Sequence, residues 1–141
     1  MPVTILAAYL ILPGTAQQAL ALYQRALGAK VVDTKPMSSM PGLESAEGRL
    51  MHAHLTIDGR DLMLADTMPG APSPAAGNVS VCLNYDDPDE MQRAFDGLAE
   101  GGAVAHPVHD TPWGARFGML TDAYGIEWML NFQKPGTSSA P

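Results

Sequence analysis

The order of the predicted elements is the feature that most constrains the fold of this 141-residue chain. The patterns of apolar residues predict one strand, one helix and three further strands, and then the same order a second time. The two halves span about residues 3–66 and 78–133. Because neither half alone has enough apolar surface for a stable core, we expect the halves to pack on each other or on a partner chain.

The first half is predicted to contain one helix at residues 16–27 and strands at residues 3–12, 29–35, 49–58 and 62–66. Thr15 occupies the position of a helix N-cap, and Gly28 is suited to the left-handed conformation that ends a helix. The strand at 49–58 alternates between an apolar face and a polar face that carries His52 and His54. Asp66 ends the last strand and is interpreted as a turn-forming residue rather than a ligand.

The second half is predicted to contain one helix after residue 87 and strands at residues 78–85, 103–108, 115–121 and 126–132. Asp87, Pro88 and Glu90 form the pattern of a capping box, which predicts the start of the helix. Large apolar residues alternate along the last strand with Glu127 and Met129. We therefore expect these two side chains to face away from the helix.

Composition excludes several classes of protein. Hydrophobic residues make up 46% of the chain and charged residues 16%, which is typical of a folded globular domain. No apolar run reaches the ~18 residues of a membrane-spanning helix. The net charge of −7 excludes a basic surface for nucleic acid or membrane.

The single cysteine and the absence of a secretory signal predict a cytoplasmic protein. Residues 134–141 are predicted to be a disordered tail.

Polar side chains on the predicted strands form a candidate small-molecule site. Residues two positions apart on a strand lie on the same face, so each polar face presents several such side chains together. If the sheet curls, these faces line one concave surface. The candidate ligand-binding residues on them are His52, His54, Asn78, Ser80, Cys82, Glu127 and Met129.

Two interpretations of His52, His54 and Glu127 stay open. Two imidazoles and one carboxylate suit a divalent metal ion with open coordination positions. Alternatively, both histidines only make hydrogen bonds on a partly solvated strand face. Glu127 is also a candidate general base, or a carboxylate paired with Arg116.

Trp113 and Arg116 lie on a sharp turn that enters a strand, and both are further ligand-binding candidates. In a functional interpretation, Trp113 stacks on a ligand and Arg116 binds an anion. In a structural interpretation, which we favour, Arg116 stacks on Trp113 and ties the hairpin, with Asp122 as a candidate partner. Cys82 is interpreted as a small core-like residue rather than a nucleophile.

The segments WGARFG at residues 113–118 and TDAYGIEW at residues 121–128 are similar to the C-terminal signature of a known family. They resemble the PhnB-like branch of the vicinal oxygen chelate superfamily, which includes glyoxalase I, bleomycin-resistance proteins, fosfomycin-resistance enzymes and extradiol dioxygenases. Residues 19–29, 51–53 and 62–66 also match this branch. The resemblance covers about residues 5–131.

This resemblance implies an α+β glyoxalase-like fold in a single domain of residues 1–133. Paired βαβββ modules would form a curled mixed sheet cup with the helices outside, and the protein would be a homodimer. The family's metal-ligand positions fall on Ala8, Asn78 and Met129. None of the three binds a hard divalent ion as the family residues do.

The resemblance leaves two main functions. In the first, the protein binds a small molecule in the cup without the usual metal ligands and with no cofactor, as bleomycin-resistance proteins do. In the second, it is a metal-dependent lyase, isomerase or dioxygenase that uses His52, His54 and Glu127. A dimerising module without catalysis is a third reading. Members of the branch are sometimes described as methyltransferases, but the sequence shows no glycine-rich nucleotide loop to support that activity.

Overall fold

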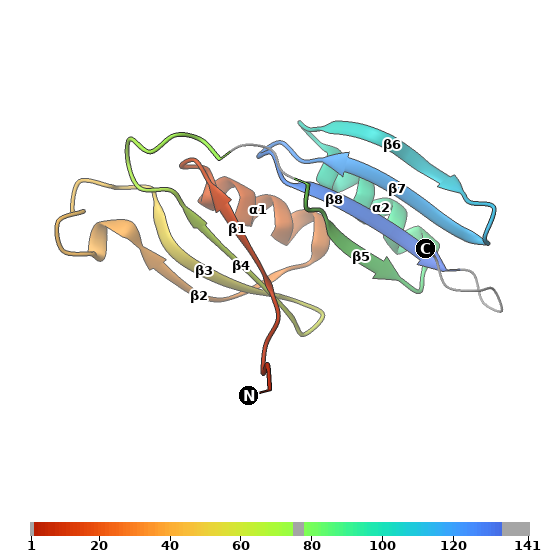
Figure 1. Ribbon diagram of the computed structural model, residues 1–141, viewed down its shortest axis with the longest axis horizontal. Helices are drawn as coiled ribbons and strands as arrows, with labels where there is room; N and C mark the ends of the chain where they lie inside the picture. The colour runs from red at the N-terminus through yellow and green to blue at the C-terminus, as the bar shows by residue number, and fades with distance from the viewer. Residues whose placement is uncertain (1, 75–77, 134–141) are drawn as a thin grey trace. The chain divides into compact units, whose positions relative to one another are not determined.

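A computed structural model describes residues 2–74 and 78–133 of the chain (Figure 1). These residues form two α-helices and eight strands, and the strands make two open four-stranded sheets. The elements divide between two compact units, with unit 1 at residues 1–75 and unit 2 at residues 76–141. The predicted α+β class and the repeated βαβββ order are confirmed. The tail predicted at residues 134–141 lies outside the described residues.

Unit 1 has the sheet order β1-β4-β3-β2, in which β1 runs parallel to β4 and the other pairs are antiparallel. Its elements are β1 (Ala8–Leu12), α1 (Ala16–Leu27), β2 (Lys30–Pro36), the short 3-10 helix η1 (Met37–Ser39), β3 (Leu50–Ile57) and β4 (Arg60–Asp66). The helix has its predicted bounds. The first strand was predicted to begin near residue 3 but begins at Ala8, so the apolar segment before it lies outside the sheet.

The core of unit 1 lies between α1 and one face of its sheet. Leu22 and Tyr23 of α1 are buried, as are Leu12, Leu55 and Leu64 of the strands that they cover. Because side chains alternate across a strand, the other residues of these strands lie on the opposite face. That face carries the polar positions predicted from the sequence. We call the sheet face opposite the helix the open face of each unit.

A buried carboxylate joins three elements of unit 1. Asp66, 7% exposed at the end of β4, accepts hydrogen bonds from the backbone N–H groups of Ala16 and Leu50, both at 2.9 Å. It therefore caps α1 and fixes the start of β3. The expectation of a simple turn-forming role for Asp66 was wrong. Thr15 was also expected to cap α1, but its side chain makes no capping hydrogen bond.

Unit 2 has the matching sheet order β5-β8-β7-β6, with β5 parallel to β8. Its elements are β5 (Val81–Tyr85), α2 (Pro88–Ala99), β6 (Ala103–Asp110), β7 (Ala115–Thr121) and β8 (Glu127–Gln133). The predicted cap is confirmed, since the Asp87 carboxylate accepts hydrogen bonds from the N–H groups of Asp89 and Glu90. The strand predicted from residue 78 begins only at Val81.

The core of unit 2 lies under α2. Phe95 and Leu98 of the helix are buried together with Trp128 of β8. Gly118 on β7 lets the helix approach closely, because a Cβ atom there would lie 2.7 Å from the Phe95 ring. Asp122, only 3% exposed, accepts the indole N–H of Trp128 at 2.9 Å and two backbone N–H groups of the β7–β8 turn. The turn is thus tied to the core.

None of the helices in residues 2–74 and 78–133 is long and apolar enough to cross a membrane.

Replacement of Asp66 by alanine tests the buried carboxylate. Asp66→Ala leaves two buried N–H groups without acceptors, so we expect the free energy of unfolding to fall by about 3 kcal/mol. Thr15→Ala is the matched control and should change it by less than about 1 kcal/mol, because the Thr15 hydroxyl has no hydrogen-bond partner. Urea unfolding followed by circular dichroism measures both. Equal losses in the two variants would contradict the assigned role of Asp66.

Candidate functional sites on the open sheet faces

The open face of unit 1 brings His52 and His54 together on β3, as predicted. His54 is paired in the sheet with Met63 of β4, which in turn is paired with Tyr9 of the edge strand β1. These four side chains share the open face because paired residues of neighbouring strands point to the same side. Tyr9 is also 44% exposed. The result is a patch of two imidazoles, one phenol and one thioether.

Each histidine ring is held by one neighbour. Tyr9 Oη lies 2.7 Å from Nδ1 of His52, and Asp61 Oδ1 lies 2.6 Å from Nε2 of His54. The His54 and Asp61 side chains are both about 30% exposed. Such contacts fix the ring orientation and leave the second ring nitrogen of each histidine on the open face. The hydrogen-bonding role that the sequence suggested for the histidines is present.

Sequence reasoning did not identify Tyr9 and Asp61. Asp61 fell outside the predicted strand at residues 62–66, whereas β4 begins at Arg60. Ala8 was assigned to the family's first-strand ligand position by counting from the helix. However, Ala8 is paired with Leu62, whose side chain is buried under α1. Tyr9 is therefore the β1 residue that reaches the open face beside the histidines, and only the strand register reveals this.

The open face of unit 2 carries Cys82, Glu127 and Met129, as predicted. Cys82 is paired with Met129, and Met129 is paired with Met119 on the next strand. Two amides lie beside this row. Asn131 Nδ2 donates to Asn84 Oδ1 at 3.0 Å, and Asn84 Nδ2 points to Cys82 Sγ at 3.7 Å. The candidate residues Asn78 and Ser80 precede β5 and are not part of the sheet.

Cys82 is an exposed residue, so its interpretation as core-like was wrong. Partial burial of the sulfur raises the pKa of the Cys82 thiol, because a thiolate loses hydration there. The hydrogen bond from Asn84 acts in the opposite direction and is the smaller effect. The thiol is consequently protonated at neutral pH, which does not favour a role as a nucleophile.

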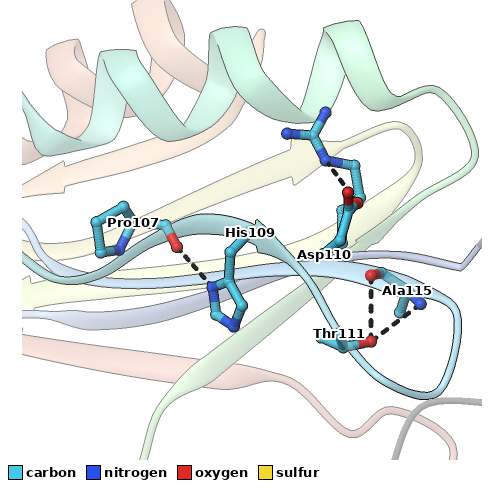
Figure 2. A network of polar contacts seen from close by, with 6 residues as sticks. Pro107, His109, Asp110, Thr111 and Ala115 are labelled. Carbon is cyan, nitrogen blue, oxygen red and sulfur yellow. Dashed lines mark hydrogen bonds and ion pairs between the residues drawn. The ribbon is translucent and has the colours of Figure 1, made fainter.

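Trp113 lies in the turn between β6 and β7, and Arg116 is the second residue of β7. Figure 2 shows polar contacts of this hairpin. The Thr111 hydroxyl closes this hairpin by bonding both the N–H and the carbonyl of Ala115. Arg116 does tie the hairpin, but its ion-pair partner is Asp110 of β6, with Nε and Oδ1 3.5 Å apart, and not Asp122 or Glu127. Asp122 is instead used by the β7–β8 turn.

The structure separates Arg116 from the open face. Arg116 alternates with Phe117 along β7 and lies on the same side as Gly118, which is the side covered by α2. Trp113 sits at the tip of the turn and is 38% exposed. Figure 2 shows His109 and Asp110 projecting to opposite sides of β6. His109 packs edge-on against Phe117 of the open face, with ring centroids 6.2 Å apart.

The donors on the open faces do not form a hard-metal site within one unit. Taken separately, the described residues of unit 1 and unit 2 contain no group of three His, Cys, Asp or Glu side chains that could hold a metal ion. His52 and His54 belong to unit 1 and Glu127 to unit 2. At the remaining family positions, Met129 offers a thioether and Ala8 offers no donor, and neither suits a hard divalent ion.

Comparison with known proteins identifies the family. The model of the glyoxalase/bleomycin resistance protein/dioxygenase superfamily matches residues 5–130. The chain belongs to this superfamily. Protein YjdN from Escherichia coli is 31% identical over 141 aligned residues, which cover 92% of this chain and 95% of YjdN.

Solved structures of the superfamily agree with this assignment. Protein PA1353 from Pseudomonas aeruginosa is 34% identical, with a TM-score of 0.84 over 93% of this chain and 98% of that one. A Bacillus cereus PhnB protein, described as a putative 3-demethylubiquinone-9 3-methyltransferase, is 26% identical, with a TM-score of 0.76 over 90% of this chain and 98% of that one. The resemblance to the PhnB-like branch is thus confirmed.

The pKa of Cys82 can be tested by alkylation. The rate of reaction with iodoacetamide follows the thiolate fraction, so its midpoint in pH should be higher for the folded protein than for the protein in urea. Asn84→Ala removes the opposing hydrogen bond and should raise the midpoint further. If the pH midpoint of alkylation were lower for the folded protein than for the unfolded chain, burial would not be what sets the pKa of Cys82.

Proposed function

We propose that the protein binds a small organic molecule on the open face of each sheet and does so without the metal ligands usual in glyoxalases. The observation that carries the proposal is the set of hydrogen-bonded pairs on these faces. Tyr9 holds His52, Asp61 holds His54, and Asn131 holds Asn84. Side chains held in this way are preorganised for a ligand, which lowers the entropy cost of binding.

The open face of unit 1 supports recognition of polar groups. Each histidine ring has one nitrogen engaged by a neighbour, and the other remains for a ligand. A neutral imidazole can donate at one nitrogen and accept at the other. His52 and His54 can therefore bond a ligand that offers both a donor and an acceptor.

The open face of unit 2 supports recognition of an apolar or aromatic group. Met119 and Met129 are flexible and polarisable and adapt to rings of different shapes. Phe117 and the Asn84 amide lie next to them in the sheet register and add a flat surface and a polar edge. The net charge of −7 favours a neutral or cationic ligand over an anion.

We expect ligand contacts with Trp113 and Arg116 near the β6–β7 turn, and with Asn78 and Ser80 before β5, to contribute less to binding than contacts with the open faces. Trp113 is exposed enough to stack on a ligand, and Asn78 and Ser80 precede the edge strand β5. Arg116 is already paired with Asp110, so a contact with a ligand anion would compete with that ion pair. We therefore assign the main contacts to the open faces themselves.

The metal-dependent lyase, isomerase or dioxygenase is not favoured. It would need His52, His54 and Glu127 to act as one ligand set. However, neither unit's described residues contain a group of three His, Cys, Asp or Glu side chains that could hold a metal ion, and the donor types at Ala8 and Met129 do not suit a hard divalent ion. The methyltransferase description belongs to the Bacillus cereus protein, and we do not extend it to this chain.

We also propose that the protein is a cytoplasmic homodimer, as the resemblance implies. The segment before the edge strand β1 exposes apolar side chains that a second copy would cover. These exposed residues are Val3, Ile5 and Leu6. The single cysteine, which rules out an intrachain disulfide, supports a reducing compartment.

Ligand binding can be tested with a library of small aromatic and heteroaromatic molecules screened by saturation-transfer NMR. We expect hits with one ligand per open face whose affinity is unchanged after treatment with EDTA. His54→Ala and Met129→Ala should each weaken a hit that contacts the altered side chain by about tenfold, the value of one lost contact of about 1.4 kcal/mol.

Gln18→Ala on α1 and Arg93→Ala on α2 are matched controls, because both side chains are exposed on a helix. The controls should leave affinity unchanged. Hits that vanish with EDTA would instead support the metal-dependent alternative. Hits that are insensitive to both open-face variants would contradict the proposed surface.

The homodimer is tested by light scattering after size-exclusion chromatography. Leu6 is 95% exposed, so Leu6→Asp should not disturb either core but should place a charge in the proposed interface. We expect the wild-type mass to be twice that of the variant. Val104→Asp on β6, where Val104 is 46% exposed, is the control and should remain dimeric. A monomeric wild-type protein would refute the dimer.

A further inference from the structure

We infer that the open face of unit 2 carries a site for a soft monovalent metal ion, Cu(I), formed by the sulfur atoms of Cys82, Met129 and Met119. This inference goes beyond the proposed ligand-binding function and does not depend on it. It follows from the sulfur-containing side chains at three neighbouring positions, one on each of three adjacent strands.

The strand register places the three residues in one row. Cys82 of β5 is paired with Met129 of β8, and Met129 is paired with Met119 of β7. All three lie on the face away from α2, because Trp128 and Leu130, on either side of Met129, are buried in the core. Cys82 is exposed, and the two methionines are partly exposed. An ion can therefore reach the row from solvent.

The spacing of the row suits a single ion. Adjacent strands lie about 4.8 Å apart, which sets the distance between neighbouring positions of the row. Metal–sulfur bonds of about 2.3 Å place three sulfur atoms around one ion at about 4 Å from each other. Cys82 and Met119, at the two ends of the row, are about 9.6 Å apart at the backbone, so the methionine side chains, which have three rotatable bonds, must lean toward the middle of the row to share one ion.

The donor set selects the kind of metal. One thiolate and two thioethers are soft ligands, which select Cu(I) over Mg²⁺, Ca²⁺ and Mn²⁺, ions that prefer oxygen. This site differs from the carboxylate and imidazole sites considered above, since it uses no His, Asp or Glu side chain. Met129 stands at the position where the family resemblance places a carboxylate ligand, so the same position offers a soft donor instead.

A chain of amides supports the thiolate. Asn131 Nδ2 donates to Asn84 Oδ1 at 3.0 Å, which turns the Asn84 NH₂ group toward Cys82 Sγ at 3.7 Å. A donor aimed at a ligating sulfur favours its charged form and fixes its position. Metal binding replaces the thiol proton by Cu(I) and releases that proton to solvent, so affinity should rise with pH.

The test is an anaerobic competition between the reduced full-length protein and the chromogenic Cu(I) chelator bicinchoninate, with no organic ligand present. We expect the wild-type protein to withdraw one Cu(I) per chain. Met129→Leu and Met119→Leu keep the volume of the side chain but remove the sulfur, and each should lower affinity at least about tenfold. Cys82→Ser should abolish binding and the thiolate–copper absorption band.

Met68→Leu is the matched control, because Met68 is an exposed methionine that follows β4 and belongs to neither open face, and it should leave the affinity for Cu(I) unchanged. Circular dichroism shows whether each variant is folded. The inference is overturned if the wild-type protein leaves Cu(I) with the chelator, or if both methionine variants bind as the wild type does. A stoichiometry of half an ion per chain, with Cys82 of two copies sharing the metal, would also overturn it.

Discussion

Hydrogen bonds from backbone N–H groups to one buried carboxylate hold the elements of unit 1 together. Asp66 joins the start of α1, the start of β3 and the end of β4. Hydrogen bonds to a charged acceptor contribute about 1.5–3 kcal/mol each, and their loss would leave buried donors unsatisfied. Asp122 has a comparable place in unit 2, where it ties the β7–β8 turn to Trp128. Both carboxylates fix strands whose other side forms the open face.

The two faces of each sheet carry different kinds of side chain, because the helix of each unit covers only one face. The covered face contains the apolar core, including Leu64 under α1 and Trp128 under α2. The open face is free to carry polar and sulfur-containing side chains at little cost to stability. The paired side chains of this face are the groups that we propose contact a ligand in each unit. Membership of a superfamily with many activities does not by itself determine that chemistry.

Local patterns in the sequence predicted the elements well, because alternation and capping depend on neighbouring residues. The bounds of α1 and β7 were predicted correctly. The partners of Asp66, which lie 50 and 16 residues away, could not be predicted from such patterns. The same is true of Tyr9, which reaches His52 across 43 residues of sequence. Arg116 was assigned the wrong partner because Asp110 is opposite it only in the observed register.

We propose that ligands contact the open faces and not the helix-covered cores. Methionine methyl NMR tests it most directly, because the nine methionines of the chain include reporters of both environments. Met63, Met119 and Met129 lie on the open faces, whereas Met37 and Met91 are fully buried. On titration with a small molecule that binds, we expect shifts at one or more of the three open-face methyl groups and little change at the two buried ones. Shifts confined to Met37 and Met91 would contradict it.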